Sequence, residues 1–261
     1  MTPQTVDAGD GPDEIDPPRI TRQRHELRRR TLSVARTERL TPHMIRLTVE
    51  GPELDGFISG APDDHVKLFI PDDSAEGQAR RDYTPRRYRD GQLLLDVVDH
   101  PGGPAADWAR EVAVGDTVEI GGPRGSQVIE GGIAHWLLIG DETALPAIGR
   151  RIEETPADGA VTSLVAVPGA ADEQQFDTKA TLDARWLHRP LAEAADPAPY
   201  LKALEGITLP PRCFVWIAAE AGVTRAIREA LLQRGHPKHW MKASGYWVRG
   251  EADASVKSME D

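Results

Sequence analysis

A change of pattern near Gly131 divides this 261-residue sequence into two unlike parts. Before it, short runs rich in β-branched and apolar residues are separated by clusters of Gly, Pro and Asp, which is typical of short strands and turns. After it, apolar runs alternate with stretches of helical periodicity, the βαβ pattern of a parallel sheet. A chain of this length accommodates two ordinary domains. The sequence therefore predicts a β domain followed by an α/β domain.

The first part, residues 20–131, is predicted to form a six-stranded antiparallel β-barrel. A helix is expected after the fourth strand, because Pro104 suits a first helical position and Trp108 and Val112 lie four residues apart. The six predicted strands are 31–37, 44–49, 65–70, 93–98, 117–120 and 127–129.

The second part, residues 132–250, is predicted to form a parallel-sheet α/β domain. The segment 168–211 is less clear, with a possible strand at 185–187 and a helix over 191–205 that two prolines interrupt. An acidic, Pro-rich tail at 1–19 is expected to be disordered, and 251–261 is a polar tail. Clear signals predict strands at 135–139, 161–167, 213–218 and 246–248 and helices at 143–153 and 223–234.

Composition excludes several classes of function. The net charge of -11 argues against nucleic acid as a main partner, because phosphate binding needs a basic surface. The single cysteine, Cys213, excludes a disulfide framework or a thiolate cluster and is expected in the core. No segment approaches the roughly 20 apolar residues of a membrane span, and the N-terminus lacks the features of a signal peptide. These features predict a cytoplasmic protein without membrane insertion.

The run Arg81-Asp82-Tyr83-Thr84 contains side chains that suit a flavin. In an extended backbone Arg81 and Tyr83 point to one side and Thr84 to the other. Tyr83 can stack on an aromatic ring system, Arg81 can pair with phosphate, and Thr84 offers a hydroxyl. The alternative is an exposed basic loop with a half-buried tyrosine, which a short motif alone does not exclude.

A second run, residues 100–109, follows a strand and begins a helix. Its small residues leave backbone N–H groups free to approach a pyrophosphate at the positive end of that helix. His100 adds a ring donor. The alternative is a simple Gly-Pro turn into a surface helix anchored by Trp108. The two motifs, separated by one strand within the β half, together favour FAD binding.

In both motifs the sequence resembles the siderophore-interacting proteins. This family is a branch of the ferredoxin-reductase-like flavoenzymes and includes ferric-siderophore reductases. The resemblance implies an FAD-binding barrel followed by an NAD(P)H-binding α/β domain. It also implies that Arg81, Tyr83 and Thr84 hold the flavin and that His100, Gly103, Ala105 and Ala106 surround its pyrophosphate. The resemblance rests on residues 40–46, 65–68, 81–84, 100–109, 121–126, 140–148, 218–220 and 245–250, nearly end to end.

The expectation of NADPH rests on the resemblance alone, because the sequence contains no G-x-G-x-x-G dinucleotide-binding fingerprint. Thr143 and Ala144 begin a predicted helix after a parallel strand, where a ligand meets helix N–H groups. Glu220 is expected beside the nicotinamide, and Arg225 and Arg228 near the 2′-phosphate. The alternatives are a helix capped by Asp141 or Glu142, and solvated helix arginines.

The substrate expected from the resemblance is a ferric siderophore, which is often anionic and calls for cations. The candidates are Lys67, Arg124, Lys242 and Arg249, each of which is otherwise an ordinary surface charge. No resident metal is assigned, since no carboxylate or thiolate ligand accompanies His236 and His239 in the sequence.

The predicted activity is that of a monomeric, NADPH-dependent flavin reductase that releases iron as Fe(II). It requires no catalytic acid, base or nucleophile, because the cofactor carries the redox chemistry. Three alternatives stay open at this point: a reductase serving ferredoxin or another acceptor, a flavin-loaded siderophore-binding accessory protein, and an α/β binding protein without flavin.

Overall fold

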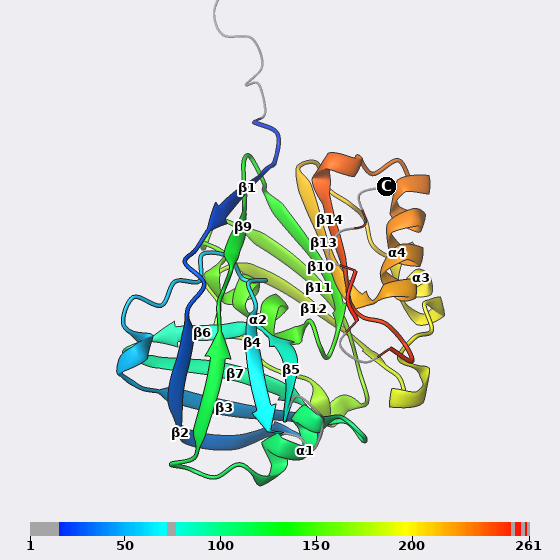
Figure 1. Cartoon of the computed structure of the whole chain (residues 1–261). Helices are drawn as coiled ribbons and strands as arrows, with labels where there is room; N and C mark the ends of the chain where they lie inside the picture. The colour runs from blue at the N-terminus through cyan, green and yellow to red at the C-terminus, as the bar shows by residue number, and fades with distance from the viewer. Residues whose placement is uncertain (1–15, 72–76, 252–253, 257–258, 260–261) are drawn as a thin grey trace, which may run out of the picture.

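The computed structural model describes residues 16–71, 77–251, 254–256 and 259, which form two large sheets, a two-stranded sheet and several helices (Figure 1). Most of the predicted acidic tail lies outside the described residues. Its last residue does not belong to a tail, because Arg19 begins a strand, β1 (Arg19–Arg24), which pairs with β9 (Gly125–Glu130).

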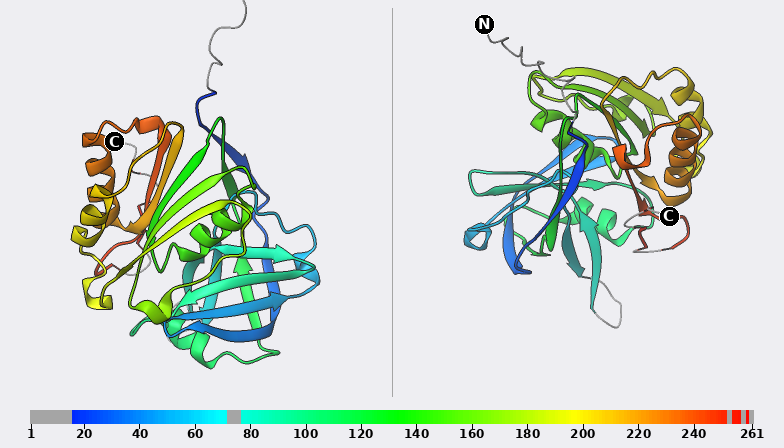
Figure 2. Two further views of the ribbon diagram at one scale, coloured as in Figure 1. Left: turned by 180° about the vertical axis from the view of Figure 1, so that it is seen from behind. Right: turned by 90° about the horizontal axis from the view of Figure 1, so that it is seen from above.

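The first half contains an antiparallel, seven-stranded sheet that curls into a half-barrel, visible from behind and from above in Figure 2. Its inner face is apolar, and α1 (Pro104–Glu111) packs against its strands as predicted. The strand order is β5-β4-β8-β2-β3-β7-β6. The strands are β2 (Arg29–Thr41), β3 (Met44–Glu50), β4 (Val66–Pro71), β5 (Gln78–Tyr83), β6 (Pro85–Arg89), β7 (Gln92–Val98) and β8 (Thr117–Gly121).

The predicted fold class is confirmed, but the strand list of the first half was incomplete. The sequence analysis missed β1, β5 and β6 because arginines interrupt the apolar pattern of these strands. In β1, moreover, all six residues are exposed, so no apolar alternation is present. The predicted strand at 127–129 exists as β9, but it pairs with β1 outside the seven-stranded sheet.

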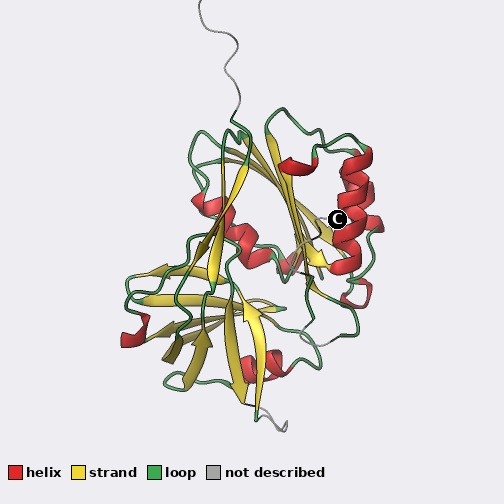
Figure 3. Ribbon diagram, turned by 45° about the horizontal axis from the view of Figure 1, so that its top comes forward, coloured by secondary structure: helices red, strands yellow, loops and turns green. Residues whose placement is uncertain are grey.

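The second half is a five-stranded parallel sheet of order β12-β11-β10-β13-β14, as predicted from its βαβ pattern. α2 lies on the face toward the half-barrel, and α3 and α4 cover the opposite face (Figure 3). The strands are β10 (His135–Asp141), β11 (Ala160–Val167), β12 (Thr181–His188), β13 (Cys213–Glu220) and β14 (Met241–Trp247). The helices are α2 (Leu145–Glu154), α3 (Ala198–Glu205) and α4 (Ala221–Gln233), with 3-10 turns at Pro52–Leu54, Ala170–Asp172, Leu191–Glu193 and Lys238–Trp240.

The central strands of this sheet are buried on both faces, which explains their continuous apolar sequences. Cys213 is buried as predicted, and burial raises the pKa of its thiol to about 12. The unclear segment contains a full strand, β12, and a helix, α3, that begins at Ala198, with Pro197 as its N-cap residue and Pro199 in its first turn. α2 begins at Leu145 and not at Thr143, since Ala144 is the N-cap residue.

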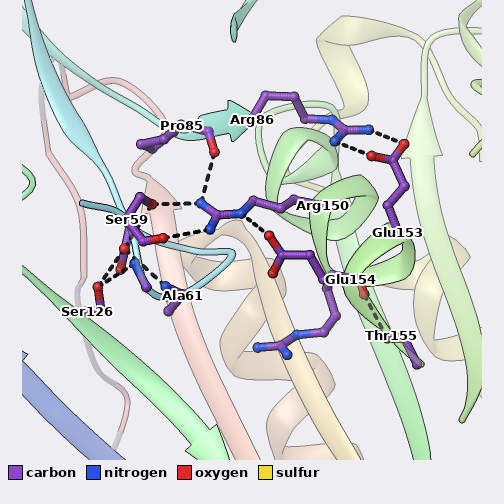
Figure 4. A network of polar contacts seen from close by, with 12 residues as sticks. Ser59, Ala61, Pro85, Arg86, Ser126, Arg150, Glu153, Glu154 and Thr155 are labelled. Carbon is purple, nitrogen blue, oxygen red and sulfur yellow. Dashed lines mark hydrogen bonds and ion pairs between the residues drawn. The ribbon is translucent and has the colours of Figure 1, made fainter. Parts of the chain in front are cut away.

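Arginine side chains join the two halves where α2 meets β6 (Figure 4). The guanidinium of Arg86 donates to both carboxylate oxygens of Glu153, at 2.7 and 2.6 Å. Arg150 of α2 donates to the Ser59 hydroxyl and to the carbonyls of Ser59 and Pro85. These contacts hold the half-barrel and the parallel sheet together at one edge.

Candidate functional site

The Arg81-x-Tyr83-Thr84 motif occupies the end of β5 and the link to β6. Arg81 and Tyr83 are half-buried on the same side of the strand as the buried Ala79, and Tyr83 packs against the core of the half-barrel. Burial raises the pKa of the Tyr83 phenol, so the ring is neutral at physiological pH. Thr84 is buried just beyond the strand. The structure therefore places Arg81 and Tyr83 on the same side of β5, as the alternation of an extended strand predicts.

The second motif connects β7 to α1 and leaves the start of that helix uncapped. Gly103 is the N-cap residue, and no described side chain caps the helix. Pro104 has no N–H, and the N–H groups of Ala105 and Ala106 belong to the first turn of the helix, at its positive end, where no described side chain caps them. A methyl group on Gly103 would lie 2.5 Å from Cε1 of His100, so only glycine lets the imidazole ring lie over the helix start.

The fold brings these two motifs together, because α1 packs against β5 and β7. The result is one site with a stackable tyrosine, a cation, a ring donor and free helix N–H groups. This set matches two parts of FAD, the flavin ring and the pyrophosphate. The residues present therefore fit FAD.

Across from this site, the carboxyl end of β10 carries a buried hydrogen-bond centre at Asp141. One oxygen of Asp141 accepts from the Thr143 N–H and hydroxyl. The other accepts from the Glu220 N–H at 3.1 Å and from the Trp247 indole N–H at 2.8 Å. Asp141 is fully buried and thus ties the ends of β10, β13 and β14 together at the point where the strand order reverses, which is where α/β sheets bind ligands.

Glu220 caps α4 and does not present a free carboxylate. One carboxylate oxygen accepts from the N–H groups of Gly222 and Val223, and the other accepts from the Arg249 N–H. The Glu220 side chain is only 6% exposed and its carboxylate already has these partners, and its place beside a nicotinamide stays a prediction.

The remaining residues expected around NADPH differ in their accessibility. Ala144 is fully buried, so its side chain offers no open surface, whereas Thr143 is half-buried. Arg225 is exposed near the start of α4, and Arg228 is half-buried one turn further on. The alternative of a helix cap by Asp141 or Glu142 is wrong, because no described side chain caps α2, and in this segment Asp141 accepts only from Thr143, which precedes the N-cap residue Ala144. Leu145, Ile148 and Ile152 form the buried face of α2 as that alternative proposed.

Two of the four candidate substrate cations are paired with carboxylates. Lys67 of β4 lies 3.0 Å from Asp82 of β5, and Lys242 of β14 lies 2.5 Å from Asp63, which precedes β4. Arg124 and Arg249 are exposed and form no ion pair with any residue in the described ranges. Sequence reasoning missed Asp63 and Asp82, because neither position belongs to a pattern that predicts its partner.

Two kinds of feature are absent from the described residues. No group of three or more His, Cys, Asp or Glu side chains is placed to hold a metal ion. No helix there combines the length and apolar character that a membrane crossing needs.

Family models match both halves of the chain. The model described as siderophore-interacting FAD-binding domain matches residues 33–79 and 73–127. The model described as siderophore-interacting protein matches residues 133–250. The uncapped helix and the Tyr83 motif both fall in the first of these regions.

Three individual proteins are similar over nearly their whole length. The NADPH-dependent ferric-chelate reductase of Escherichia coli K12 is 31% identical over 249 residues, covering 87% of this chain and 95% of that protein. The ferric vibriobactin reductase ViuB of Vibrio cholerae is 26% identical, covering 85% of this chain and 90% of that protein. A crystal structure of a siderophore utilization protein from T. fusca has a TM-score of 0.85 at 35% identity, covering 91% of this chain and 99% of that one.

Proposed function

Because this chain belongs to the siderophore-interacting protein family and is an FAD-containing oxidoreductase, we propose that it uses bound FAD to reduce the Fe(III) of ferric siderophores with NADPH as the electron donor. The overall reaction converts one NADPH and two Fe(III) into NADP⁺, one proton and two Fe(II). Iron then leaves the chelate, because the hard oxygen ligands of siderophores hold Fe(II) less tightly than Fe(III).

One observation carries this proposal: the Tyr83 end of β5 and the uncapped start of α1 belong to a single site. FAD, when bound, supplies the conversion between a two-electron hydride donor and a one-electron metal acceptor. Tyr83 stacks on the ring system, Arg81 neutralises phosphate charge, and Thr84 adds a hydroxyl at the flavin edge. His100 and the N–H groups of Ala105 and Ala106 bind the pyrophosphate beside Gly103.

The donor and the acceptor are assigned to the two remaining groups of residues. We place NADPH at the carboxyl end of the parallel sheet, near Thr143 and Ala144, with Arg225 toward the 2′-phosphate. The ferric siderophore is placed among Lys67, Arg124, Lys242 and Arg249. The E. coli relative is named an NADPH-dependent ferric-chelate reductase, which supports the choice of donor and acceptor.

We also propose that residues 20–131 form the FAD-binding domain and 132–250 the NAD(P)H-binding domain of a monomer that works in the cytoplasm. The change from antiparallel to parallel pairing between β9 and β10 supports this boundary. A cytoplasmic location agrees with the use of a reduced nicotinamide and with a single, buried thiol.

The proposal is tested by steady-state turnover with a colorimetric Fe(II) chelator. Purified, FAD-loaded protein is mixed with NADPH and a ferric siderophore, and formation of the Fe(II) complex is followed. We expect Fe(II) formation that depends on both NADPH and protein-bound FAD. No Fe(II) above the level of free FAD with NADPH would contradict the proposal.

A basic strand supports a second candidate, in which an acidic electron carrier such as ferredoxin is the partner. Arg19, Arg22 and Arg24 are exposed on β1 in a chain whose net charge is negative. Attraction between opposite charges raises association rates and weakens with salt. Transfer from reduced ferredoxin to the flavin that is fast at low salt and slow at high salt would favour this candidate. A rate independent of salt would count against it.

A further inference from the structure

A groove lies between the half-barrel and the parallel sheet, where β6 meets α2. Its volume is about 450 Å³, within the range of roughly 300–1,000 Å³ that is usual for pockets that bind small molecules. One wall comes from β6 and from the loop that leads to β4, and the other comes from the C-terminal half of α2. The groove is therefore built by both halves of the molecule.

This groove is separate from the sites proposed for FAD, NADPH and the iron substrate. The ten residues of α2 span about 15 Å, from Leu145 beside the proposed nucleotide site to Glu154 at the groove. Among the described residues that line the groove, none is assigned to either cofactor or to the iron substrate. The proposed function therefore gives the groove no role.

Part of the groove is lined by large apolar side chains that stay open to solvent. Ile58 is 56% exposed and Tyr88 is 38% exposed. The Tyr88 ring is held in place, because its hydroxyl donates to the Leu54 carbonyl at 2.9 Å and its ring meets the Phe57 ring edge to face at 5.2 Å. A ligand with an apolar group would remove this surface from water without a rearrangement of Tyr88.

Of the three guanidinium groups that line the groove, two already have carboxylate partners (Figure 4). Arg86 donates to both carboxylate oxygens of Glu153, and Arg150 pairs with Glu154. Arg87 is exposed and forms no hydrogen bond or ion pair with any residue that the structure describes. Three arginines and two glutamates leave one net positive charge in the groove, so it is matched to a ligand with one negative charge.

We propose that this groove binds a small organic monoanion with an aromatic or branched apolar group, such as an aryl carboxylate. The apolar group contacts Ile58 and Tyr88, and the anionic group pairs with the Arg87 guanidinium. Because the lining comes from both halves, such a ligand contacts β6 and α2 at the same time. This inference goes beyond the proposed function and does not depend on it.

Two fluorescent probes separate the contribution of the apolar surface from that of the charge. Anilinonaphthalene sulfonate is a monoanion, and phenylnaphthylamine is the same ring system without the sulfonate. Fluorescence titration of the FAD-loaded protein gives the dissociation constant of each probe. Arg87→Gln should weaken binding of the anion about fivefold, the scale of a partly exposed ion pair, and leave the neutral probe unaffected. Ile58→Ser should weaken both probes about fivefold, because both lose the same apolar contact.

Each variant has a matched control outside the groove. Arg89→Gln removes the same charge two residues further along β6, where Arg89 pairs with Asp90 and does not line the groove. Val114→Ser makes a comparable apolar-to-polar change at a side chain that is 67% exposed in the loop after α1. Both control variants should bind the two probes as the wild type does.

The preference for the anion decides the result. A preference that falls in Arg87→Gln and not in Arg89→Gln, together with weaker binding of both probes in Ile58→Ser, supports the inference. Equal preferences in the two arginine variants, or unchanged binding in Ile58→Ser, overturns it. Displacement of the anion by NADP⁺ also overturns it, because the probe then occupies the nucleotide site. None of these results bears on the proposed function, which is tested by turnover.

Discussion

Arg86 of β6 and Glu153 of α2 form a two-point ion pair that joins the half-barrel to the parallel sheet. The Arg86 side chain is only 7% exposed, and its Nε lies 4.0 Å from Asp96. Asp96 in turn accepts two hydrogen bonds from Arg46. The junction is therefore a buried charge network, and it fixes the distance between the sites proposed for FAD and NADPH.

Replacement of Glu153 by Gln should destabilise the protein, because it leaves the buried Arg86 guanidinium without its main counter-charge. We expect the free energy of unfolding to fall by about 2 kcal/mol, a value reduced because Glu153 is partly exposed. Urea unfolding measures the loss. Glu154→Gln is the control, since Arg150 keeps its bonds to Ser59 and Pro85; an equal loss in both variants would contradict a special role for the Arg86 pair.

Tyr83→Ala should yield protein without flavin, because the aromatic face proposed to stack on the ring system is gone. Tyr83→Phe keeps that face and should retain FAD. The absorbance ratio of flavin to protein after gel filtration measures occupancy. Equal flavin content in Tyr83→Ala and the wild type would remove Tyr83 from the site.

Gly103→Ala should weaken FAD binding about tenfold, because the added methyl group collides with the His100 ring and displaces it from the start of α1. Titration of the apoprotein with FAD measures the dissociation constant. Gly169→Ala is the control, since its backbone is extended and a methyl group there meets no atom within 4 Å. A normal FAD affinity in Gly103→Ala would show that His100 does not contact the cofactor.

His236 should make stability depend on pH. Burial lowers the pKa of its imidazole, and the hydrogen bond with the Trp240 carbonyl offsets this in part. The unfolded chain, with a histidine pKa of about 6.5, therefore takes up the proton first as the pH falls. The stabilising contribution is complete above about pH 6.5 and is lost as the pH falls toward the folded-state pKa.

Urea midpoints measured across this range test the dependence on His236. His236→Gln should show a smaller loss of stability on acidification than the wild type. The exposed His239 provides the control: it lowers the pKa of His236 less than burial does, so His239→Gln should stay closer to the wild type than His236→Gln does. Identical curves for all three proteins would contradict the assignment.

The sequence predicted the elements that have a clear apolar period and missed those that do not. The continuous apolar run at Cys213 and the helical period of Leu145, Ile148 and Ile152 both correspond to real elements. β5 and β6 carry arginines where an alternating strand would carry apolar residues, and their burial depends on neighbours that only the fold supplies.

The same distinction applies to the site. The Tyr83 motif and the Gly103 turn are local, so their chemistry can be recognised from neighbouring residues. The Asp63–Lys242 pair joins residues 179 positions apart, and the capping role of Glu220 depends on a helix that begins at the next residue. Pattern reasoning named Lys242 as a candidate substrate cation and Glu220 as a neighbour of the nicotinamide, and it could not include these partners.

The central claim is tested most directly by the anaerobic absorption spectrum of the FAD-loaded protein during addition of NADPH and then of a ferric siderophore with an Fe(II) chelator. We predict that NADPH bleaches the flavin band and that the ferric siderophore restores it while Fe(II) is trapped. A flavin that NADPH does not bleach would contradict the account and favour a ferredoxin-fed reductase or an accessory protein.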